Sequence, residues 1–468
     1  MNEYKNILII GAGRAGKLLF NDIKKNYPDC KVIGFVDDLK DKNTLGKIDD
    51  LSKINKIYKV DEMIVAIPST DGKLVRKILL NNKKNRVPIK IVPRDQKIIN
   101  LSDVRYLEVK NMELEDFLGR PFINKNIEKL KSFYKEKVVL ITGGAGSIGS
   151  EIVRQLIDLN VKKVVVYDNS EYLIFNLDQL LKEHEIRNKC DLIIGNILNK
   201  DKLDYIIRKE KPDIIFHAAA YKHVYLMEDN IDEAILNNIV GTRNVIDVAI
   251  KNNVPQFTFI STDKVVNPTS IMGATKKLCE FYIKCLDSKK TKFNIVRFGN
   301  VINSNGSVLP LFERQIEKYK YVTVTHKDIM RFFMSIREAA QLVIESTANG
   351  GKNSIHVLNM GELIKIHEIA ECLIRSKNLL PGEDIDIKIT GLRKGEKMIE
   401  ELYTGKEKTN LVKTKIKNVL TLRNLEKCDF NINKVFEDLE KISSGFSTSV
   451  RDEIKIYLKK IFISLKIK

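Results

Sequence analysis

The chain has 468 residues, of which 43% are hydrophobic and 30% are charged. This length exceeds what one hydrophobic core usually serves, so we expect two domains. The formal net charge is +19, but lysine is spread along the whole chain without the interleaved aromatic residues that nucleic-acid-binding surfaces favour. We therefore expect a globular protein that does not bind nucleic acid.

No stretch of sequence reaches the roughly 18 apolar residues of a membrane span. The amino terminus opens directly on an apolar strand pattern, with no signal peptide. We expect a soluble, cytoplasmic protein. The six cysteines and six histidines form neither a C-x-x-C pair nor a mixed cluster, so we predict no metal site.

The beginning of the chain predicts a small doubly wound α/β domain. Gly11, Gly13 and Gly16 follow an apolar strand and precede a helical pattern, and the next strand ends at Asp37 and Asp38. This is the context of a dinucleotide-binding turn. The same glycines can also serve strand-to-helix packing alone, so a nucleotide site and a purely structural turn both stay open.

A second glycine-rich turn follows a charged connecting segment. Gly143, Gly146 and Gly149 have the wider spacing typical of short-chain dehydrogenases. Glycines let the backbone approach a pyrophosphate, and the amino terminus of the following helix attracts that anion. The next strand ends at Asp168, whose carboxylate would accept ribose hydroxyls and repel a 2′-phosphate. This pattern favours NAD over NADP.

Further motifs follow in one order: HAAAYKHVYLMEDN, NNIVGTRNV, STDKVVNPTSIMGATKK, RFGNVINSNGSVLPLF, TVTHKDIMRFFM and GLRKGEKMIEEL. Together they resemble the polysaccharide-biosynthesis branch of the extended short-chain dehydrogenases, whose characterised members are UDP-N-acetylglucosamine 4,6-dehydratases. GAGRAG, FVDD and LEDFLGR resemble the first domain of its long members. Those members usually carry transmembrane helices ahead of that domain, so we expect this sequence to be either a naturally soluble form or a part from which that region was removed.

The resemblance implies an α/β fold with two Rossmann-type doubly wound parallel-sheet domains in tandem. The second would be an extended short-chain dehydrogenase fold with a small C-terminal substrate-binding lobe. We predict a Rossmann-like domain at 1–110, a connecting helical segment at 111–136, a catalytic domain with its substrate lobe at 137–405, and an extension with a basic amphipathic helix at 406–468.

By resemblance, the chain is a hydro-lyase that carries out the NAD-dependent 4,6-dehydration of UDP-N-acetylglucosamine. Carbon 4 loses hydride to NAD, water is eliminated across carbons 5 and 6, and hydride returns to carbon 6. The UDP-4-keto-6-deoxy product would serve surface polysaccharide or glycoprotein glycan biosynthesis. The elimination needs a base at carbon 5 and an acid at the carbon 6 hydroxyl.

The candidate catalytic residues lie in STDKVVNPTSIMGATKK. Thr262, Asp263 and Lys264 follow a strand and should project into the crevice at the carboxyl end of the sheet. By resemblance, Asp263 is the acid, Lys264 is the base, and Thr262 hydrogen-bonds the oxygen on carbon 4. Met272 replaces the tyrosine of short-chain dehydrogenases and resembles the branch that keeps the carbon 5 configuration. Lys276, one helical turn later, should bind the nicotinamide ribose.

The resemblance implies further contacts. The residues expected around NAD are Gly143, Gly146, Ser147, Ile148, Gly149, Asp168, Asn196, Ile197, Ala218, Ala219 and Lys276. Those expected around the substrate are Lys222 and His223 beside the sugar, Asn300 at the sugar phosphate, Arg331 and Arg393 at the diphosphate, and Glu396 at the uridine ribose. For each arginine the alternative is a surface salt bridge. His217 and His356 belong to apolar strands and are interpreted as core histidines.

The carboxyl-terminal segment predicts an amphipathic helix. Its apolar residues at helical spacing are Ile454, Tyr457, Leu458, Ile461, Phe462 and Leu465, with lysines on the other face. Such a helix suits peripheral contact with an anionic membrane. Packing against its own protein or a second subunit is the preferred interpretation, and we expect a homo-oligomer.

Two other functions stay open. A nucleotide-sugar epimerase shares the binding site and the first hydride transfer, but it has no use for an acid and a base at carbons 5 and 6. The second alternative is a non-catalytic scaffold that binds NAD and a nucleotide sugar. The intact Asp263, Lys264 and Lys276 disfavour a scaffold. The group that removes the carbon 4 hydroxyl proton is not identified, and Thr262 with a bound water is the first candidate.

Overall fold

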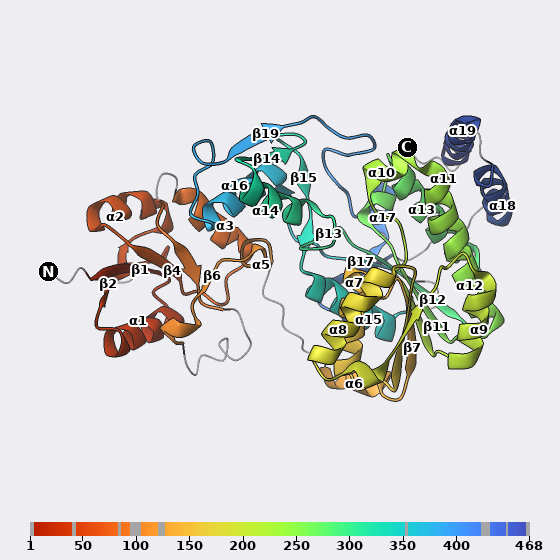
Figure 1. Ribbon diagram of the computed structural model, residues 1–468, viewed down its shortest axis with the longest axis horizontal. Helices are drawn as coiled ribbons and strands as arrows, with labels where there is room; N and C mark the ends of the chain where they lie inside the picture. Colours follow the sequence, from red (N-terminus) through yellow and green to blue (C-terminus); the bar gives the residue numbers. More distant parts are fainter. Residues whose placement is uncertain are drawn as a thin grey trace. The chain divides into compact units, whose positions relative to one another are not determined.

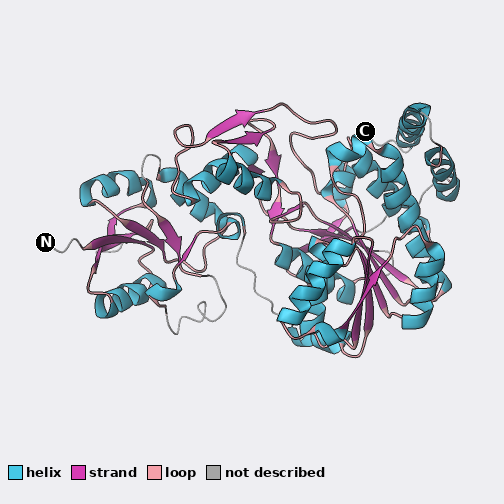
Figure 2. Cartoon of the chain, viewed as in Figure 1, coloured by secondary structure: helices cyan, strands magenta, loops and turns pink. Residues whose placement is uncertain are grey.

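The computed structural model describes residues 4–39, 44–82, 86–93, 104–119, 127–351, 354–422, 431–445 and 448–464. The chain divides into two compact units, each of which is described by itself (Figure 1). The first unit takes residues 1–124, 306–335 and 363–391, and the second takes 125–305, 336–362 and 392–468. Both contain helices and parallel strands (Figure 2), so the predicted α/β class is confirmed.

The first unit is built on a six-stranded sheet with the order β3-β2-β1-β4-β5-β6. Its strands are β1 (Lys5–Ile10), β2 (Cys30–Val36), β3 (Thr44–Gly46), β4 (Glu62–Val65), β5 (Ile89–Ile91) and β6 (Lys110–Asn111), and its helices are α1 (Arg14–Asn26), α2 (Leu51–Tyr58), α3 (Gly72–Asn81) and α5 (Leu114–Leu118). All neighbouring strands are parallel except β5 and β6. Apolar residues such as Ile7, Ile9 and Ile64 are fully buried between this sheet and its helices.

Two later stretches of chain complete the first unit. They form α14 (Val308–Lys318), β14 (Tyr321–Val324), β15 (Met330–Arg331), β16 (Phe333–Met334), β18 (Ile364–Lys365), α16 (Ile366–Ser376) and β19 (Asp386–Ile389). Helix α16 contacts α3, and the Nε of Arg76 donates to Oε1 of Glu368 at 2.9 Å. From the sequence we assign these stretches to a substrate lobe of the catalytic domain, and those domain boundaries stay a prediction.

The second unit contains a nine-stranded sheet with the order β20-β21-β17-β12-β11-β10-β7-β8-β9. Its strands are β7 (Val138–Thr142), β8 (Lys163–Asp168), β9 (Cys190–Ile194), β10 (Ile214–His217), β11 (Gln256–Ile260), β12 (Lys292–Arg297), β17 (Ser354–Leu358), β20 (Leu411–Lys413) and β21 (Val419–Leu422). The strands from β17 to β9 are parallel, whereas β21 pairs antiparallel with β17 and β20.

Helices flank this sheet on two sides (Figure 2). The described helices of this unit are α6 (Ile127–Tyr134), α7 (Ser147–Asp158), α8 (Glu171–Glu183), α9 (Lys200–Glu210), α10 (Val224–Asp229), α11 (Ile231–Ile235), α12 (Gly241–Lys251), α13 (Ile271–Cys285), α15 (Ile336–Asn349), α17 (Gly405–Thr409), α18 (Ile432–Ser443) and α19 (Thr448–Ser464). Helix α7 packs against α15, and α9 packs against α12. Their apolar stripes bury the two faces of the sheet, as a parallel sheet requires.

The strand order indicates where the ligand-binding crevice of a doubly wound sheet is expected. From β7 the chain proceeds through β8 to β9, then returns to the other side of β7 and continues through β10, β11 and β12. The connections after β7 and β10 therefore diverge, and in doubly wound sheets this divergence marks the ligand-binding crevice at the carboxyl ends of the strands. The turn containing Gly143, the residues Ala218 and Ala219, and Thr262 all follow carboxyl ends of adjacent strands.

The carboxyl-terminal helix α19 packs on the second unit. Ile454, Leu458 and Ile461 are buried in the main hydrophobic core of that unit, where α19 contacts α11 and α18. The apolar face is therefore covered by its own chain, in agreement with the preferred interpretation, while Leu465 lies outside the described residues. Within those residues no helix is both long and apolar enough to cross a membrane.

Truncation of this helix's buried face should destabilise the protein. We expect Leu458→Ala to lower the free energy of unfolding by about 2–5 kcal/mol, because the change removes buried methyl groups and leaves a cavity. Ile456 on the same helix is 55% exposed, so Ile456→Ala is the control and should change that free energy by no more than about 0.5 kcal/mol. Urea denaturation measures the free energy of unfolding of both variants. Equal losses in the two variants would contradict the burial of Leu458 against the second unit.

Candidate active site

The glycine-rich turn after β7 requires glycine at two positions. Gly143 has φ +66°, and a Cβ there would lie 2.5 Å from the backbone nitrogen of Ala219. A Cβ on Gly149 would lie 2.3 Å from the carbonyl oxygen of Gly143. Gly146 caps α7, and none of the described side chains caps this helix terminus. The first N–H groups of α7 therefore lack intrahelical partners and can receive an anion.

Asp168 braces this turn from the end of β8. Its Oδ2 accepts a hydrogen bond from the N–H of Ala145 at 3.1 Å, and Oδ1 accepts one from the N–H of Ser170 at 3.0 Å. The exposed Asn196 accepts from the N–H of Leu198 at 2.9 Å. An uncapped helix terminus beside a strand-end carboxylate is the chemistry that a dinucleotide needs, so these residues fit NAD.

Thr262, Asp263 and Lys264 form a compact cluster directly after β11. Asp263 is fully buried, and its Oδ1 accepts hydrogen bonds from Thr262 Oγ1 at 2.8 Å and from Lys264 Nζ at 3.0 Å. Oδ2 of Asp263 is also buried and accepts no hydrogen bond from the described residues. Because a buried oxygen without a partner is costly, Oδ2 is well placed to engage a ligand hydroxyl.

Lys264 lies among three oxygen atoms. Its Nζ is 3.0 Å from Oδ1 of Asp263, 3.1 Å from Oδ1 of Asn300 in β13 (Asn300–Val301), and 3.5 Å from Oε1 of Glu400. A base at carbon 5 needs the neutral amine, so a proton must leave Lys264 before it can act. We did not name Glu400 from the sequence: it belongs to GLRKGEKMIEEL, where spacing alone does not distinguish it from Glu396.

Lys276 and Met272 lie on α13 beside the cluster. Lys276 is 6% exposed, its Nζ donates to the carbonyl oxygen of Ile260 at 3.0 Å, and the same nitrogen lies 4.4 Å from the ring centroid of Phe259. Burial lowers the pKa of Lys276 to about 8. Met272 is buried in the main hydrophobic core. The predicted contact of Lys276 with the nicotinamide ribose stays a prediction.

Two histidines prove to be core residues, as interpreted from the sequence. His217 is fully buried between the hydroxyls of Thr142 at 2.6 Å and Thr242 at 2.9 Å. Burial and the charge of Lys276 hold its pKa well below the ordinary value. Burial also lowers the pKa of His356 to about 4. Both imidazoles are therefore neutral and structural near pH 7.

The residues predicted to bind substrate are more dispersed. Lys222 and His223 follow β10, and desolvation lowers the pKa of each. The guanidinium of Arg393 lies 4.9 Å from the ring centroid of Tyr225, within range of a cation–π contact. Oε2 of Glu396 accepts from the N–H of Arg393 at 3.1 Å. The substrate contacts of these residues stay predictions.

Arg331 belongs to the first unit. It is buried, and its Nη1 donates to the carbonyl oxygen of Met330 at 2.8 Å. A surface salt bridge, the alternative interpretation, does not suit a buried guanidinium. Its predicted contact with the substrate diphosphate stays a prediction.

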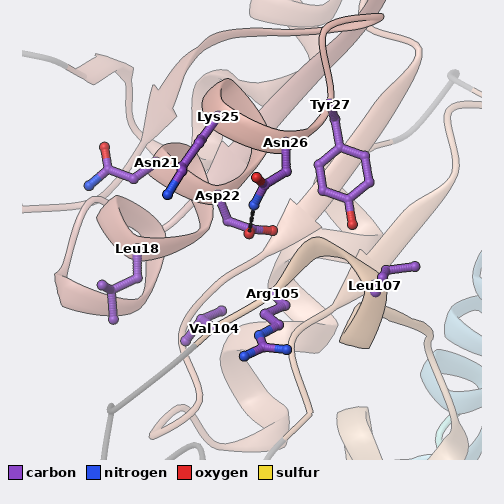
Figure 3. A pocket seen from close by; sticks show the side chains of 9 residues that line it. All are labelled: Leu18, Asn21, Asp22, Lys25, Asn26, Tyr27, Val104, Arg105 and Leu107. Atoms are coloured by element: carbon purple, nitrogen blue, oxygen red, sulfur yellow. Dashed lines mark hydrogen bonds between the residues drawn. The ribbon is translucent and has the colours of Figure 1, made fainter.

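A surface hollow lies in the first unit at the carboxyl end of α1 (Figure 3). It is lined by residues that include Lys25, Asn26 and Arg105. Its acidic residue, Asp22, accepts from Nδ2 of Asn26 and from the N–H of Tyr106, both at 2.8 Å. The glycine turn of this unit precedes the opposite end of α1, so the hollow does not lie at that turn.

Comparison with known proteins identifies the family. Residues 139–423 match the family described as "Polysaccharide biosynthesis protein". The chain belongs to this family. The match covers the glycine-rich turn, Glu400 and the residues Thr262, Asp263 and Lys264 after β11, which we call the catalytic triplet. It therefore includes every element of the second unit from which the crevice is built.

Three relatives of this family member show what the chain is similar to. "Capsular polysaccharide biosynthesis protein CapD" of Staphylococcus aureus is 37% identical over 86% of this chain and 69% of its own length. A "UDP-N-acetylglucosamine 4,6-dehydratase (inverting)" of Campylobacter jejuni is 31% identical over 68% of this chain and 93% of its own length. A "UDP-glucose 4-epimerase" of Rickettsia rickettsii is 33% identical over 58% of this chain and 80% of its own length.

A solved structure is similar as well. The X-ray structure of Pen from Bacillus thuringiensis is 36% identical, with a TM-score of 0.57, and the match covers 62% of this chain and 90% of that chain. The described strands of the second unit have the doubly wound parallel order of the extended short-chain dehydrogenase fold. The predicted fold class is therefore confirmed by the structure and by its neighbours.

Proposed function

We propose that the chain is an NAD-dependent UDP-N-acetylglucosamine 4,6-dehydratase that retains the configuration of carbon 5. The observation that carries the proposal is the cluster of Thr262, Asp263 and Lys264 at the crevice edge of β11. It provides a carboxyl group and an amine side by side, which is what removal of a proton from one carbon and of hydroxide from its neighbour requires. Relatives named as dehydratases support this choice.

The cluster also supplies a path for the carbon 4 hydroxyl proton. Thr262 Oγ1 donates to Oδ1 of Asp263 at 2.8 Å, so the hydroxyl can pass its own proton to Asp263 while taking one from the sugar. Asp263 then holds the proton that the carbon 6 hydroxyl needs in order to leave as water. Lys264 takes the carbon 5 proton and later delivers one of its ammonium protons to the same face, so carbon 5 acquires deuterium in deuterated water. No proton is gained or lost over the cycle.

The residues at the glycine-rich turn would hold NAD. The N–H groups at the start of α7 suit the pyrophosphate, and Asp168 suits the adenosine ribose. When bound, NAD supplies the hydride acceptor for carbon 4 and the hydride donor for carbon 6. The buried ammonium of Lys276 would stabilise negative charge that develops on the oxygen of carbon 4. The predicted homo-oligomer and cytoplasmic location stay predictions.

The test is incubation with NAD and UDP-N-acetylglucosamine in deuterated water, followed by NMR of the sugar. We expect a 4-keto-6-deoxy sugar with deuterium at carbon 5 and unchanged configuration there. An inverted carbon 5 would preserve the dehydratase but overturn the retaining assignment, which we base on Met272. Recovery of the starting sugar alone, with NAD bound, would indicate the non-catalytic scaffold.

A nucleotide-sugar epimerase is the second candidate, because a relative named UDP-glucose 4-epimerase matches at 33% identity. Epimerisation at carbon 4 needs the hydride acceptor and a base for one hydroxyl. Epimerisation requires no acid or base at carbons 5 and 6, so it does not explain the presence of Asp263 and Lys264. A product that is only the 4-epimer, with hydrogen retained at carbon 5 in deuterated water, would establish the epimerase and overturn the dehydratase.

A further inference from the structure

Residues 392–403, which we call the strap, are tied to the loop that follows the catalytic triplet. Thr269 Oγ1 donates to the carbonyl oxygen of Gly395 at 3.1 Å. Nζ of Lys397 donates to the carbonyl oxygen of Val266 at 2.5 Å. These contacts join segments that are more than a hundred residues apart in the chain. The strap is therefore held at a defined position over the triplet.

The strap carries Glu400 to Lys264. Glu400 is 4% exposed, and its Oε1 lies 3.5 Å from Nζ of Lys264, whose side chain is 18% exposed. In a poorly solvated site the ion pair loses much of its hydration, so the neutral pair, an amine beside a carboxylic acid, becomes competitive with it. Transfer of a proton from the ammonium to the carboxylate would convert the ion pair into this neutral pair.

We propose that Glu400 accepts the ammonium proton of Lys264 before the elimination and returns it at the end of the cycle. An N–H bond of Lys264 breaks and an O–H bond of Glu400 forms, so the pair becomes neutral without exchange of a proton with solvent. The inference rests on the proposed function, because only dehydration requires Lys264 as a free amine. Glu400 acts through Lys264, so it is a positioning residue for the base.

Asp263 does not serve this purpose. In the proposed cycle Asp263 receives the carbon 4 proton through Thr262 and delivers it to the carbon 6 hydroxyl. If it also took the proton of Lys264, it would have no capacity for the carbon 4 proton. A second carboxylate beside Lys264 resolves this conflict, and Glu400 is the second carboxylate within 4 Å of that amine among the described ion pairs.

Other charged groups near Glu400 come from both segments. Lys264 and Asp263 belong to the triplet, and Lys397 and Glu401 belong to the strap. Burial lowers the pKa of Lys397, and the carboxylates around it oppose that change. The surroundings of Glu400 thus contain two cations and two further carboxylates. The effect of Glu400 must accordingly be separated from that of its neighbour Glu401.

The test compares pH–rate profiles of the wild type, Glu400→Gln and Glu401→Gln. In the wild type the proton moves within the pair, so kcat should vary little with pH on either side of neutrality. In Glu400→Gln, Lys264 must lose its proton to solvent. We expect kcat at pH 7 to fall about 100-fold and to recover about tenfold per pH unit on the alkaline side, with KM for UDP-N-acetylglucosamine changed less than about threefold.

Two further variants sharpen the comparison. Glu401→Gln keeps an oxygen that can accept from Nδ2 of Asn267, the present partner of Glu401 at 3.0 Å, so its profile should match the wild type. Glu400→Asp keeps a carboxylate and should retain the flat profile at a reduced rate. If Glu400→Gln does not fold, a sloping profile in Glu400→Asp would overturn the proposal, and a flat one would support it.

The outcomes separate this inference from the function beneath it. Wild-type protein that makes no 4-keto-6-deoxy sugar would overturn both. Product from the wild type, together with a Glu400→Gln rate that is unchanged or equally reduced at every pH, would overturn the role of Glu400 alone. A pH–rate profile of Glu401→Gln with the same slope as that of Glu400→Gln would also overturn the role of Glu400. Any loss of negative charge on the strap would then have the same effect on kcat.

Discussion

Lys264→Ala should lower the rate of 4-keto-6-deoxy sugar formation by about 10²–10⁴-fold, the usual contribution of a general base. The amine lies at the crevice edge, where it donates to Oδ1 of Asp263 at 3.0 Å. NAD binding should persist, because the glycine-rich turn is untouched. NMR of the sugar and calorimetry with NAD measure the two effects.

Lys264→Arg separates basicity from charge. A guanidinium keeps the positive charge beside Asp263 and Glu400 but stays protonated at all accessible pH values. We expect this variant to be as slow as Lys264→Ala and to incorporate no deuterium at carbon 5. If Lys264→Arg kept more than about a tenth of the wild-type rate, the charge of Lys264 and not its basicity would be what matters.

Arg297→Met should lower the free energy of unfolding by about 3–5 kcal/mol, the usual cost of removing one partner from a buried ion pair. Arg297 is fully buried at the end of β12, and its Nε and Nη2 donate to the two carboxylate oxygens of Glu280 at 2.7 and 2.6 Å. Its Nη1 donates to Glu407 at 2.9 Å. Without the guanidinium, the carboxylate of Glu280, which is 1% exposed, remains buried without its cation. Chemical denaturation measures the loss.

A double variant tests the explanation. Replacing both partners, as in Arg297→Met with Glu280→Leu, removes the buried charges together and should cost less than Arg297→Met alone. Oε1 of Glu280 also accepts from Oγ of Ser261 at 2.7 Å, next to the catalytic triplet, so both variants should also lower kcat. A loss below about 1 kcal/mol in Arg297→Met would contradict the assigned role of the pair.

Local patterns predicted the framework of the site well. An apolar strand followed by Gly143, Gly146 and Gly149 can be recognised from sequence because the turn geometry excludes a side chain at close approach, and the structure shows that exclusion at Gly143 and Gly149. The ends of parallel strands are also predictable, since short apolar runs mark them. Asp168 and Thr262 accordingly lie at the carboxyl edge of the sheet, as expected from the sequence.

The partners of the catalytic amine could not be predicted in the same way. Lys264 and Glu400 are 136 positions apart, and GLRKGEKMIEEL offers three glutamates at short spacing. Which of them meets Lys264 depends on how the strap crosses the triplet. Asn300, which we predicted at the sugar phosphate, lies 3.1 Å from Lys264. No periodicity in the sequence encodes such a contact, because it forms between separate loops.

The sequence by itself determined the fold class, the two glycine-rich turns, and the position of Thr262, Asp263 and Lys264 at a strand end. It also showed that Met272 replaces the tyrosine of short-chain dehydrogenases. These are local features, set by hydrophobic periodicity and by the steric demands of glycine. Only the tertiary structure decided that Glu400 flanks the catalytic amine, that Arg297 is neutralised by acidic residues from two helices, and that the apolar face of α19 is covered. Burial and charge pairing arise when distant segments pack together, and a linear pattern does not specify those neighbours.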